Sequence, residues 1–383
     1  MKLAIVHDYL IQMGGAERVV ATMAQAFPEA PIYTSATDRD HLLPQFLGKQ
    51  IINSWADRLP GIQKSFKKFF PVYPFAFRSF KPIDADVAWI SSSGFAKWIR
   101  VKSGAKTICY CHTPPRFFWN SDGYVAAELG DSLAGRSAKV VLSLLRRWDY
   151  SCAQLIDRFV ANSRCVQERI WDCYGRPSAV IHPPVEVERF SAAQEPENYY
   201  LVLSRLIGYK RIDLAIEAFN RLGERLIIIG DGPDRARLEA LAGSSISFLG
   251  RVSDAEINRY LERCRALIFP GLEDFGIAAV EAQACGRPVI AFAGGGALET
   301  VIPGETGCLF KEQTTDALAE AVSRSKTVRW SAEQIRANAL NFSKDIFLEK
   351  MRAVIGAAYQ EGSNRIAETE GSRRQEIGES YGL

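Results

Sequence analysis

The stretch from residue 266 to residue 288 constrains the fold most strongly. Its apolar run Ala266–Phe269 is short, ends at Pro270, and is typical of a buried parallel strand. An alanine-rich segment at 276–285 follows, which predicts a helix that ends at Gly286. A strand followed directly by a helix favours a parallel sheet with helical crossovers. The loop between the two elements then lies at the carboxyl end of the strand, where doubly wound sheets bind ligands.

The same alternation of strand and helix runs through both halves of the chain. Short apolar runs predict strands at 2–7, 32–34, 87–90, 107–110, 158–161, 199–203, 226–229, 246–249, 266–269 and 288–292. Helices are expected between them, notably at 16–27 and 138–156. At 383 residues the chain is long for one core and fits two. The predicted fold class is therefore α/β, with two Rossmann-like, doubly wound parallel-sheet domains.

Domain boundaries are expected where the composition changes. Residues 180–185 end a strand in a proline-rich bend, and residues 191–198 are small, polar and acidic. These changes predict an N-terminal domain at 1–185, a linker at 186–198, a C-terminal domain at 199–343 and a last helix at 344–360. Residues 361–383 are polar and mixed in charge, so a disordered tail is expected there.

Composition excludes several classes of protein. The net charge of +3 is small and no basic run resembles a nucleic-acid-binding arm, so no nucleic-acid partner is expected. No apolar run approaches the roughly 20 residues that span a bilayer, and the first residues read as a strand rather than a signal peptide. A cytoplasmic location is expected. Cys109, Cys111 and His112 could supply metal ligands, but His112 points to the opposite face of the strand, so no metal is expected.

Two glutamates, Glu273 and Glu281, stand eight positions apart around the pair Phe275-Gly276. By itself such spacing is typical of a solvated helix face. The sequence Ala-x-x-Cys-Gly-Arg-Pro-Val-Ile-Ala beyond them makes the pattern specific. It resembles the retaining nucleotide-sugar glycosyltransferases of family four, which have the GT-B fold with two domains facing across a cleft. The resemblance implies that Glu273 contacts the donor sugar and that Glu281 holds the ribose hydroxyls.

Other positions that match the family are implied to bind the donor as well. Arg205 and Lys210 follow a strand at the spacing of the family's diphosphate clamp, and a guanidinium fork with an ammonium suits that charge. Backbone groups around Arg251 are implied to recognise the base. The free amides of Gly276 and Ile277, at the start of a helix, suit a phosphate or sugar oxygen. Phe275 is also expected to contact the donor.

The first half contributes a glycine-rich turn and a histidine. Gly14 and Gly15 follow the first strand and match the family loop beside the reaction centre, although a plain tight turn gives the same pattern. His112 ends a strand, where the family has a histidine near the anomeric carbon. His7 and Asp8 also end a strand, and a structural role is favoured for both. The glycines at 294–296 and 304–310 are expected to let backbone approach the ligand, and Glu299 is expected to be structural.

The predicted activity is transfer of a hexose from a nucleotide sugar. The sequence as a whole resembles bacterial mannosyltransferases of lipid-linked polysaccharide assembly. This resemblance implies GDP-mannose as donor and a lipid-linked saccharide as acceptor. A UDP-hexose donor is the alternative, and a non-catalytic glycosyltransferase-fold binding protein is another. An epimerase or a phosphorylase on the same fold is not supported, since a phosphorylase is far longer. No cofactor or metal is expected, because fixed cations and a helix terminus stabilise the leaving diphosphate.

Residues 58–81 suggest a membrane contact. No acidic residue lies between Asp57 and Asp84, whereas six basic residues do: Arg58, Lys64, Lys67, Lys68, Arg78 and Lys81. A short helix is expected at 62–70, with aromatic residues continuing to Phe80. Two interpretations are open: a helix packed on its own domain, or a segment that rests on an anionic membrane, where each basic residue contributes roughly 1 kcal/mol.

Overall fold

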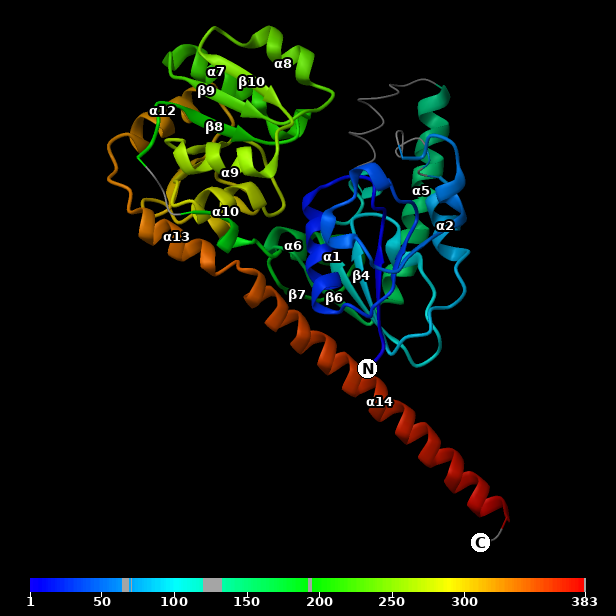
Figure 1. Ribbon diagram of the computed structural model, residues 1–383. Helices are drawn as coiled ribbons and strands as arrows, with labels where there is room; N and C mark the ends of the chain where they lie inside the picture. The colour runs from blue at the N-terminus through cyan, green and yellow to red at the C-terminus, as the bar shows by residue number, and fades with distance from the viewer. Residues whose placement is uncertain (64–68, 70, 120–132, 192–194, 382–383) are drawn as a thin grey trace. The chain divides into compact units, whose positions relative to one another are not determined.

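The computed structural model describes residues 1–63, 69, 71–119, 133–191 and 195–381, with backbone alone for 133–139 and 365–381 (Figure 1). The chain forms two units. Unit 1 comprises Met1–Asn162, Val166–Ile181 and Leu348–Leu383, and unit 2 comprises Ser163–Cys165 and His182–Phe347. Each unit has its own parallel sheet with helices on it, so the predicted α/β class with two doubly wound domains is confirmed.

Seven parallel strands in the order β3-β2-β1-β4-β5-β6-β7 form the sheet of unit 1. They are β1 (Leu3–His7), β2 (Ile32–Thr34), β3 (Ile51–Asn53), β4 (Val87–Ser92), β5 (Lys106–Cys111), β6 (Arg158–Ala161) and β7 (Ser178–Val180). Helices α1 (Gly15–Ala26), α2 (Tyr73–Arg78), α3 (Arg116–Trp119), α5 (Leu133–Gln154) and α6 (Arg164–Tyr174) connect or follow them. Because β1 and β4 are buried throughout, both faces of the sheet are covered, as a parallel sheet requires.

Six parallel strands in the order β10-β9-β8-β11-β12-β13 form the sheet of unit 2. They are β8 (Tyr200–Leu203), β9 (Leu226–Ile229), β10 (Ile246–Gly250), β11 (Leu267–Phe269), β12 (Val289–Phe292) and β13 (Gly307–Phe310). The helices are α7 (Ile212–Leu222), α8 (Arg235–Leu241), α9 (Asp254–Arg263), α10 (Ile277–Ala284), α11 (Ala297–Thr300), α12 (Thr315–Ser325), α13 (Ala332–Leu340) and the start of α14 (Lys344–Tyr381). The predicted segment at 266–288 is confirmed as β11 followed by α10, and β12 begins directly after it.

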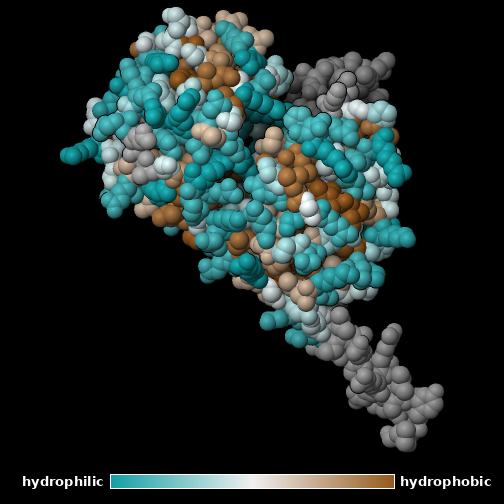
Figure 2. Space-filling view, viewed as in Figure 1, coloured by the Kyte–Doolittle hydropathy of each residue, from teal (hydrophilic) through white to brown (hydrophobic). Residues whose placement is uncertain are grey.

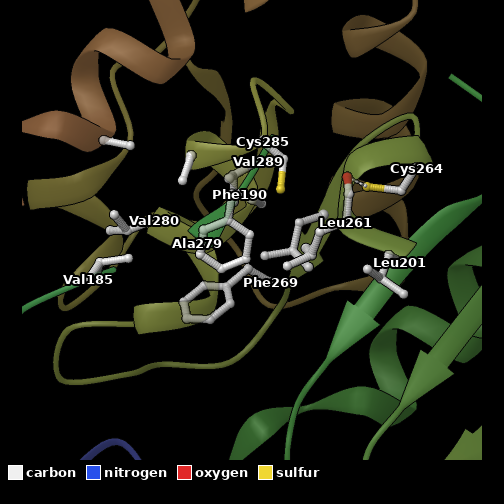
Figure 3. Packing of buried hydrophobic residues seen from close by; sticks show 14 of the residues in the cluster. Val185, Phe190, Leu201, Leu261, Cys264, Phe269, Ala279, Val280, Cys285 and Val289 are labelled. Carbon is white, nitrogen blue, oxygen red and sulfur yellow. Dashed lines mark hydrogen bonds between the residues drawn. The ribbon is translucent and has the colours of Figure 1, made fainter. Parts of the chain in front are cut away.

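One core of unit 2 lies between the sheet and α10. Leu201 of β8 and Phe269 of β11 pack there with Ala279 and Val280, and all four are buried (Figure 3). Burying a large apolar side chain contributes about 1.5–3 kcal/mol, so these contacts fix α10 and the loop before it against the sheet.

The expected linker at 186–198 is wrong in its first part. The chain enters unit 2 at His182, and Val185 pairs with Ser343 through a parallel bridge. A short 3-10 helix, η6 (Val187–Arg189), follows, and Val187 and Phe190 are buried in the core of unit 2. Figure 3 shows Phe190 in this core. The polar composition of 191–198 predicts a boundary that is too far along the chain. The apolar side chains just before residue 191 already belong to the core of unit 2. Residues 192–194 lie outside the described part of the chain.

The last helix is longer than expected. The sequence predicts an end near residue 360 and a disordered tail, whereas α14 continues to Tyr381 (Figure 1). Residues 361–383 include five glutamates and three arginines, which have high helix propensity and extend a helix once it has started.

The 58–81 segment is only partly described. The helix predicted at 62–70 falls mostly on residues 64–68 and 70, which lie outside the described residues. Beyond it α2 begins at Tyr73 with a proline in its first turn, where the missing amide costs nothing. Tyr73 and Phe77 are buried in unit 1, whereas Phe75 is exposed. On the face shown in Figure 2, hydrophilic residues cover most of the surface, and brown, hydrophobic areas lie on both units.

A buried ion pair that the sequence did not predict lies in unit 1. Lys97 Nζ is 2.7 Å from Asp149 Oδ1, and both side chains are at most 3% exposed. The second carboxylate oxygen accepts from Trp119 Nε1 at 3.0 Å and from Tyr174 Oη at 2.7 Å. Since a buried carboxylate is costly unless it is paired and hydrogen-bonded, this network fixes α3, α5 and α6 relative to one another.

Candidate active site

The sheet of unit 2 reverses its strand order at β8 and β11. From β8 the chain proceeds outward to β9 and β10, and then returns to place β11 on the other side of β8. In doubly wound sheets this switch point is where ligands bind, at the carboxyl ends of the strands. Arg205 and Lys210 follow β8, and Glu273 follows β11. The structure therefore brings three of the predicted site residues to the switch point of one sheet.

Lys210 and Glu273 form an ion pair at this edge. Their side chains are 14% and 19% exposed, so the pair is accessible without being fully solvated. Lys210 Nζ also lies 5.2 Å from the centre of the Tyr209 ring. A Cβ at Gly271 would approach the Lys210 backbone to 2.7 Å, so only glycine lets the two loops pack this closely. Arg205 is exposed at the same edge. Arg205 and Lys210 supply positive charge that can bind a diphosphate.

The amino terminus of α10 begins beside this pair. Gly276 is the N-cap residue, with φ of 89°, and a Cβ there would lie 2.6 Å from the Phe269 ring. Because Ala279 N–H makes the first bond, to Gly276 O, the amides of Ile277 and Ala278 precede the hydrogen-bonded part of the helix. Such amides are suited to an anion.

Phe275 has a different role from the one expected. Its ring is 3% exposed and stacks on His182 with a centroid distance of 5.3 Å and an interplanar angle of 26°. It also meets Phe342 edge to face. The side chain belongs to the core, so only its backbone is placed to meet a ligand.

Glu281 is held by Arg189, a contact that the sequence does not predict. Its Oε1 lies 3.2 Å from Arg189 Nη2, and its side chain is 13% exposed. The other branch of Arg189 pairs with Asp254 Oδ2 at 2.9 Å, and the guanidinium lies over the Phe190 ring. Arg189 thus orients the carboxylate predicted to hold ribose. The two residues are 92 positions apart, and nothing in the sequence near Arg189 signals this contact.

The glycine-rich loops serve the protein's own packing. A Cβ at Gly295 would lie 2.1 Å from Glu273 O, and one at Gly296 would lie 2.2 Å from the Phe275 backbone. The amide of Gly296 donates to Glu273 O at 2.9 Å. The sequence predicts that these glycines let backbone approach a ligand. In the structure they let their loop pack against the loop that carries Glu273. In the same way Gly230 packs on Ser204, next to Arg205.

Two further predicted positions in unit 2 are placed as follows. Arg251 is exposed just after β10, where a side chain or its backbone can meet a ligand. Glu299 accepts from Arg164 N–H at 2.8 Å and pairs with His182 Nε2 at 2.9 Å. The structural role expected for Glu299 agrees with these contacts.

The sheet of unit 1 has its switch point between β1 and β4. Gly14 is the N-cap of α1, and its amide donates to Glu17 Oε2 at 3.1 Å. Asp8 accepts from the amides of Ser93 at 2.6 Å and Ala96 at 2.7 Å, which makes it a structural carboxylate, as favoured from the sequence. The glycine turn at 14–15 therefore starts a helix at the carboxyl end of β1.

His112 follows β5 and is fixed on both sides of its backbone. Its N–H donates to Ser92 O at 2.9 Å, and its carbonyl accepts from Asn162 Nδ2 at 3.0 Å. Its Nε2 lies 2.8 Å from Ser91 Oγ. Burial, with a further effect of nearby His7, lowers the pKa of His112 to about 3. The ring is therefore neutral at physiological pH and can supply a hydrogen bond rather than a charge.

Metal ligands do not gather in the described part of the chain. No group of three or more His, Cys, Asp or Glu side chains there could hold an ion. Burial raises the pKa of the Cys109 thiol to about 12, which disfavours the thiolate that a metal needs. Among the described residues no helix is long and apolar enough to cross a membrane.

Comparison with known proteins accounts for most of the chain. Residues 13–189 match the family model described as Glycosyltransferase Family 4, and residues 185–342 match the model described as Glycosyl transferases group 1. The two matches adjoin near the boundary between the units. The chain therefore belongs to the glycosyltransferases of these families, and its two parallel-sheet domains are those of the GT-B fold.

Three known proteins illustrate the similarity. An alpha-1,3/1,6-mannosyltransferase, ALG2, from Candida glabrata is 23% identical over 86% of this chain and 85% of its own length. A GDP-mannose-dependent alpha-(1-6)-phosphatidylinositol monomannoside mannosyltransferase from Mycolicibacterium smegmatis is 30% identical. The matched region covers 42% of this chain and 50% of that relative. The structure of Anabaena HepE with UDP-glucose superposes with a TM-score of 0.68, at 17% identity, over 93% of this chain and 100% of that one.

Proposed function

We propose that the protein is a retaining mannosyltransferase that moves mannose from GDP-mannose to a lipid-linked saccharide. The observation that carries the proposal is the cluster at the β8–β11 switch point, where the Lys210–Glu273 pair lies beside the first amides of α10. The names of two relatives support the sugar, and one of them supports the GDP donor and a lipid acceptor. The alpha linkage in both names supports retention of configuration.

The chemistry follows from the charges at this edge. As the glycosyl bond breaks, the sugar gains oxocarbenium character and the diphosphate gains negative charge. Arg205, Lys210 and the amide of Ile277 stabilise that charge, and the loss of one such preorganised donor raises the barrier by about 2.7–4 kcal/mol. Glu273 binds sugar hydroxyls and Glu281 binds the ribose. The ion pair between Lys210 and Glu273 then opens when the diphosphate takes Lys210 as its partner.

The leaving group needs no metal in this proposal. Arg205, Lys210 and the helix terminus provide the positive charge that a divalent ion supplies elsewhere. Turnover is expected to be unchanged in excess chelator. Turnover that disappeared with chelator and returned with magnesium would contradict a metal-free diphosphate site.

A UDP-hexose is the second candidate donor. It is favoured by the solved HepE structure, which contains UDP-glucose, although that likeness shows the fold alone. A non-catalytic role is less well supported, because Glu273, Glu281, Arg205 and Lys210 are all present.

Product formation tests the proposal and its alternatives together. The purified protein is incubated with GDP-mannose, UDP-glucose, UDP-galactose or UDP-N-acetylglucosamine and a bacterial lipid extract, and the organic phase is analysed by mass spectrometry. The proposed function predicts a lipid heavier by one hexose with GDP-mannose alone. A product from a UDP-sugar would establish the second candidate, and binding of nucleotide sugars without transfer or hydrolysis would favour the scaffold.

The acceptor proposal places one surface of unit 1 on an anionic membrane. Between α2 and α5 lies an apolar groove of about 440 Å³. It is lined by Pro71, Phe75, Val141, Leu144, Leu145, Arg147, Trp148 and Ser151. Phe75, Val141 and Leu144 are 57%, 46% and 59% exposed. Arg146 and Arg147 are exposed beside them, whereas the acidic residue that follows, Asp149, is buried in its ion pair. Apolar side chains flanked by arginines suit an interface with anionic lipid.

Vesicle sedimentation tests this surface. The wild type is expected to bind vesicles of phosphatidylglycerol and phosphatidylcholine in a salt-sensitive way, and V141E/L144E is expected to release it. The control L47E/L155E changes two residues that are 74% and 73% exposed but do not line the groove, and it should bind as the wild type does. Equal binding by V141E/L144E would exclude this face. Replacing Lys64, Lys67 and Lys68 with Glu tests the basic segment in the same assay.

A further inference from the structure

A buried chain of hydrogen-bonding side chains runs through the switch point of unit 1. His7, at the end of β1, places Nδ1 3.0 Å from Ser91 Oγ and 3.2 Å from the Ser91 carbonyl oxygen. Ser91 Oγ lies 2.8 Å from His112 Nε2. At the other side of the His7 ring, Nε2 is 4.0 Å from Glu17 Oε1. The side chains of His7 and Glu17 are each 2% exposed, and Ser91 is fully buried.

The geometry assigns the direction of each hydrogen bond. The carbonyl oxygen of Ser91 can only accept, so the His7 nitrogen beside it must carry a proton. His7 Nδ1–H then also donates to Ser91 Oγ, which leaves the single hydroxyl proton of Ser91 to donate to His112. His112 Nε2 is therefore an acceptor. In a neutral imidazole the other nitrogen must carry the proton, so His112 is the Nδ1–H tautomer.

Glu17 stabilises the charged form of His7. A His7 ring with a proton only on Nδ1 would present a lone pair to the Glu17 carboxylate, and both facing atoms lack another hydrogen-bond partner. Protonation of Nε2 removes that repulsion. Burial opposes charge on His7, but Glu17, Asp8 and the Ser91 carbonyl together outweigh it and raise the pKa of His7. The 4.0 Å separation is too long for a direct hydrogen bond, so the interaction between these two atoms is one of charge.

The other charged neighbour of His7 is already saturated. Asp8 accepts from Ser92, Ser93 and the amide of Ala96, all from β4 or the turn after it. It adds favourable charge without competing for a ring nitrogen of His7. Glu17 also has a second contact, because its Oε2 accepts from the amide of Gly14. One carboxylate thus joins the glycine turn to the histidine chain.

We propose that Ser91, His7 and Glu17 are positioning residues that fix His112 as the neutral Nδ1–H tautomer. His112 is partly exposed and its Nε2 is engaged, so Nδ1–H is the group that it offers to a ligand. If the proposed function holds, His112 donates a hydrogen bond to a sugar oxygen and carries no charge, which avoids repulsion with the cationic sugar of the transition state. The tautomer itself does not depend on which donor or acceptor the protein uses.

Nitrogen-15 NMR of histidine-labelled protein tests the proposal without any substrate. The chain has four histidines, and His112→Asn assigns the signals of His112. Between pH 6 and 8, His112 should show a protonated Nδ1 and an unprotonated Nε2, and His7 should keep a proton on Nδ1 and have a pKa above that of a free imidazole. A proton on His112 Nε2, or a His7 without a proton on Nδ1, would overturn the proposal, whereas a failure of mannosyl transfer would leave these spectra unaffected.

Two Ser91 variants separate positioning from packing. Ser91→Ala removes the hydroxyl proton, so the His112 proton should redistribute toward Nε2 and kcat should fall about tenfold, with KM for the donor within about twofold. Ser91→Thr keeps the hydroxyl and should keep the wild-type tautomer. An unchanged His112 tautomer in folded Ser91→Ala would show that Ser91 does not set it. The wild-type spectrum decides the assignment even if Ser91→Thr fails to fold.

Discussion

The two sheets each have a switch point, and the two differ in how they hold charge. At β1 and β4 of unit 1 the side chains of Glu17, His7 and Ser91 are buried and interact with one another through hydrogen bonds and charge. At β8 and β11 of unit 2 the charges remain accessible in the Lys210–Glu273 pair. A buried network is already organised and changes little on binding. An accessible ion pair can exchange one partner for a ligand.

This contrast indicates a division of labour. The edge of unit 2 suits an anion, because it has two cations and free helix amides. The edge of unit 1 presents His112 in a neutral state, which suits a hydrogen bond to an uncharged sugar. Substitutions at the first edge should therefore act on affinity for the diphosphate and on its departure, and substitutions at the second should leave nucleotide affinity intact.

The largest effect is expected for the two cations. Arg205→Ala and Lys210→Ala should each lower kcat/KM about 10²–10³-fold, because each removes a preorganised partner of the leaving diphosphate. The double variant should fall short of the product of the two effects, since both residues act on one ligand. Arg221→Ala is a matched control, because this exposed arginine pairs with Asp316. Steady-state kinetics with GDP-mannose give the result, and a loss below threefold in both single variants would remove them from the site.

Glu273→Gln should act mainly on turnover. The amide keeps the size of the side chain but loses the charge that accepts strongly from sugar hydroxyls, so kcat should fall about tenfold to a hundredfold. The Kd for GDP should change less than about threefold. Calorimetric titration with GDP, combined with kcat, separates the two. A large loss of GDP affinity with unchanged kcat would place Glu273 on the nucleotide instead.

Alanine variants of two glycines in unit 2 distinguish the cost of backbone strain from the cost of disturbed loop packing. Gly295 and Gly304 have positive φ angles of 56° and 81°. A Cβ at Gly304 meets nothing within 4 Å, whereas one at Gly295 would lie 2.1 Å from Glu273 O. Gly304→Ala should cost about 1–2 kcal/mol of stability from strain alone. Gly295→Ala should cost about 1–3 kcal/mol more from overpacking.

Urea denaturation and kcat test the glycine pair together. Only Gly295→Ala should also lower kcat, because it displaces the loop that carries Glu273. Equal losses of stability and full activity in both variants would show that the close contact of the two loops is not needed for the site.

A smaller effect is expected on the free energy of unfolding, which should depend on pH through His112 and His7. The pKa of His112 is lowered to about 3 by burial and by His7, against about 6.5 in an unfolded chain. Its contribution to stability is therefore complete above pH 6.5 and is lost as the pH falls from 6.5 toward 3. His7 has the opposite sign: its pKa is raised, so its contribution is complete below pH 6.5 and is lost as the pH rises through the folded value.

The His112 contribution is measured by difference. Between pH 6 and 4 the stability of the wild type should fall more steeply than that of His112→Asn, by at most about 1.4 kcal/mol per pH unit, the value for one proton. Urea midpoints at several pH values give the two slopes. Identical slopes would mean that His112 is protonated in the folded protein, which would also remove the neutral donor at this edge.

Much of the fold follows from the sequence because its strands are short, apolar and separated by helices. The strand predicted at 32–34 matches β2, and those at 226–229 and 158–161 match β9 and β6. The carboxyl-end rule placed Arg205 and Glu273 at one edge without knowledge of their contacts. Strands β3 and β13 were not predicted, because their apolar runs are brief and, for β13, follow a glycine turn that was attributed to the ligand.

The rest depends on contacts between residues far apart in the chain. Arg189 reaches Glu281, and Lys97 reaches Asp149, without any local pattern that links them. The glycine-rich pattern around Gly295 predicts a close approach but does not specify its partner, which in the structure is the backbone of Glu273. The roles of Glu273 and Glu281 on sugar and ribose stay predictions.

Calorimetric titration of GDP and UDP into the wild type, Glu281→Ala and Asp254→Ala tests the nucleotide site most directly. Both carboxylates pair with Arg189, but only Glu281 is proposed to bind ribose, so Asp254→Ala controls for loss of an Arg189 partner. The account predicts that the wild type binds GDP more tightly than UDP. It also predicts that Glu281→Ala weakens GDP binding at least about tenfold and that Asp254→Ala stays within about twofold of the wild type. Equal GDP affinity in all three proteins, or no binding of either nucleotide by the wild type, would contradict a nucleotide-sugar site at the carboxyl edge of the unit 2 sheet.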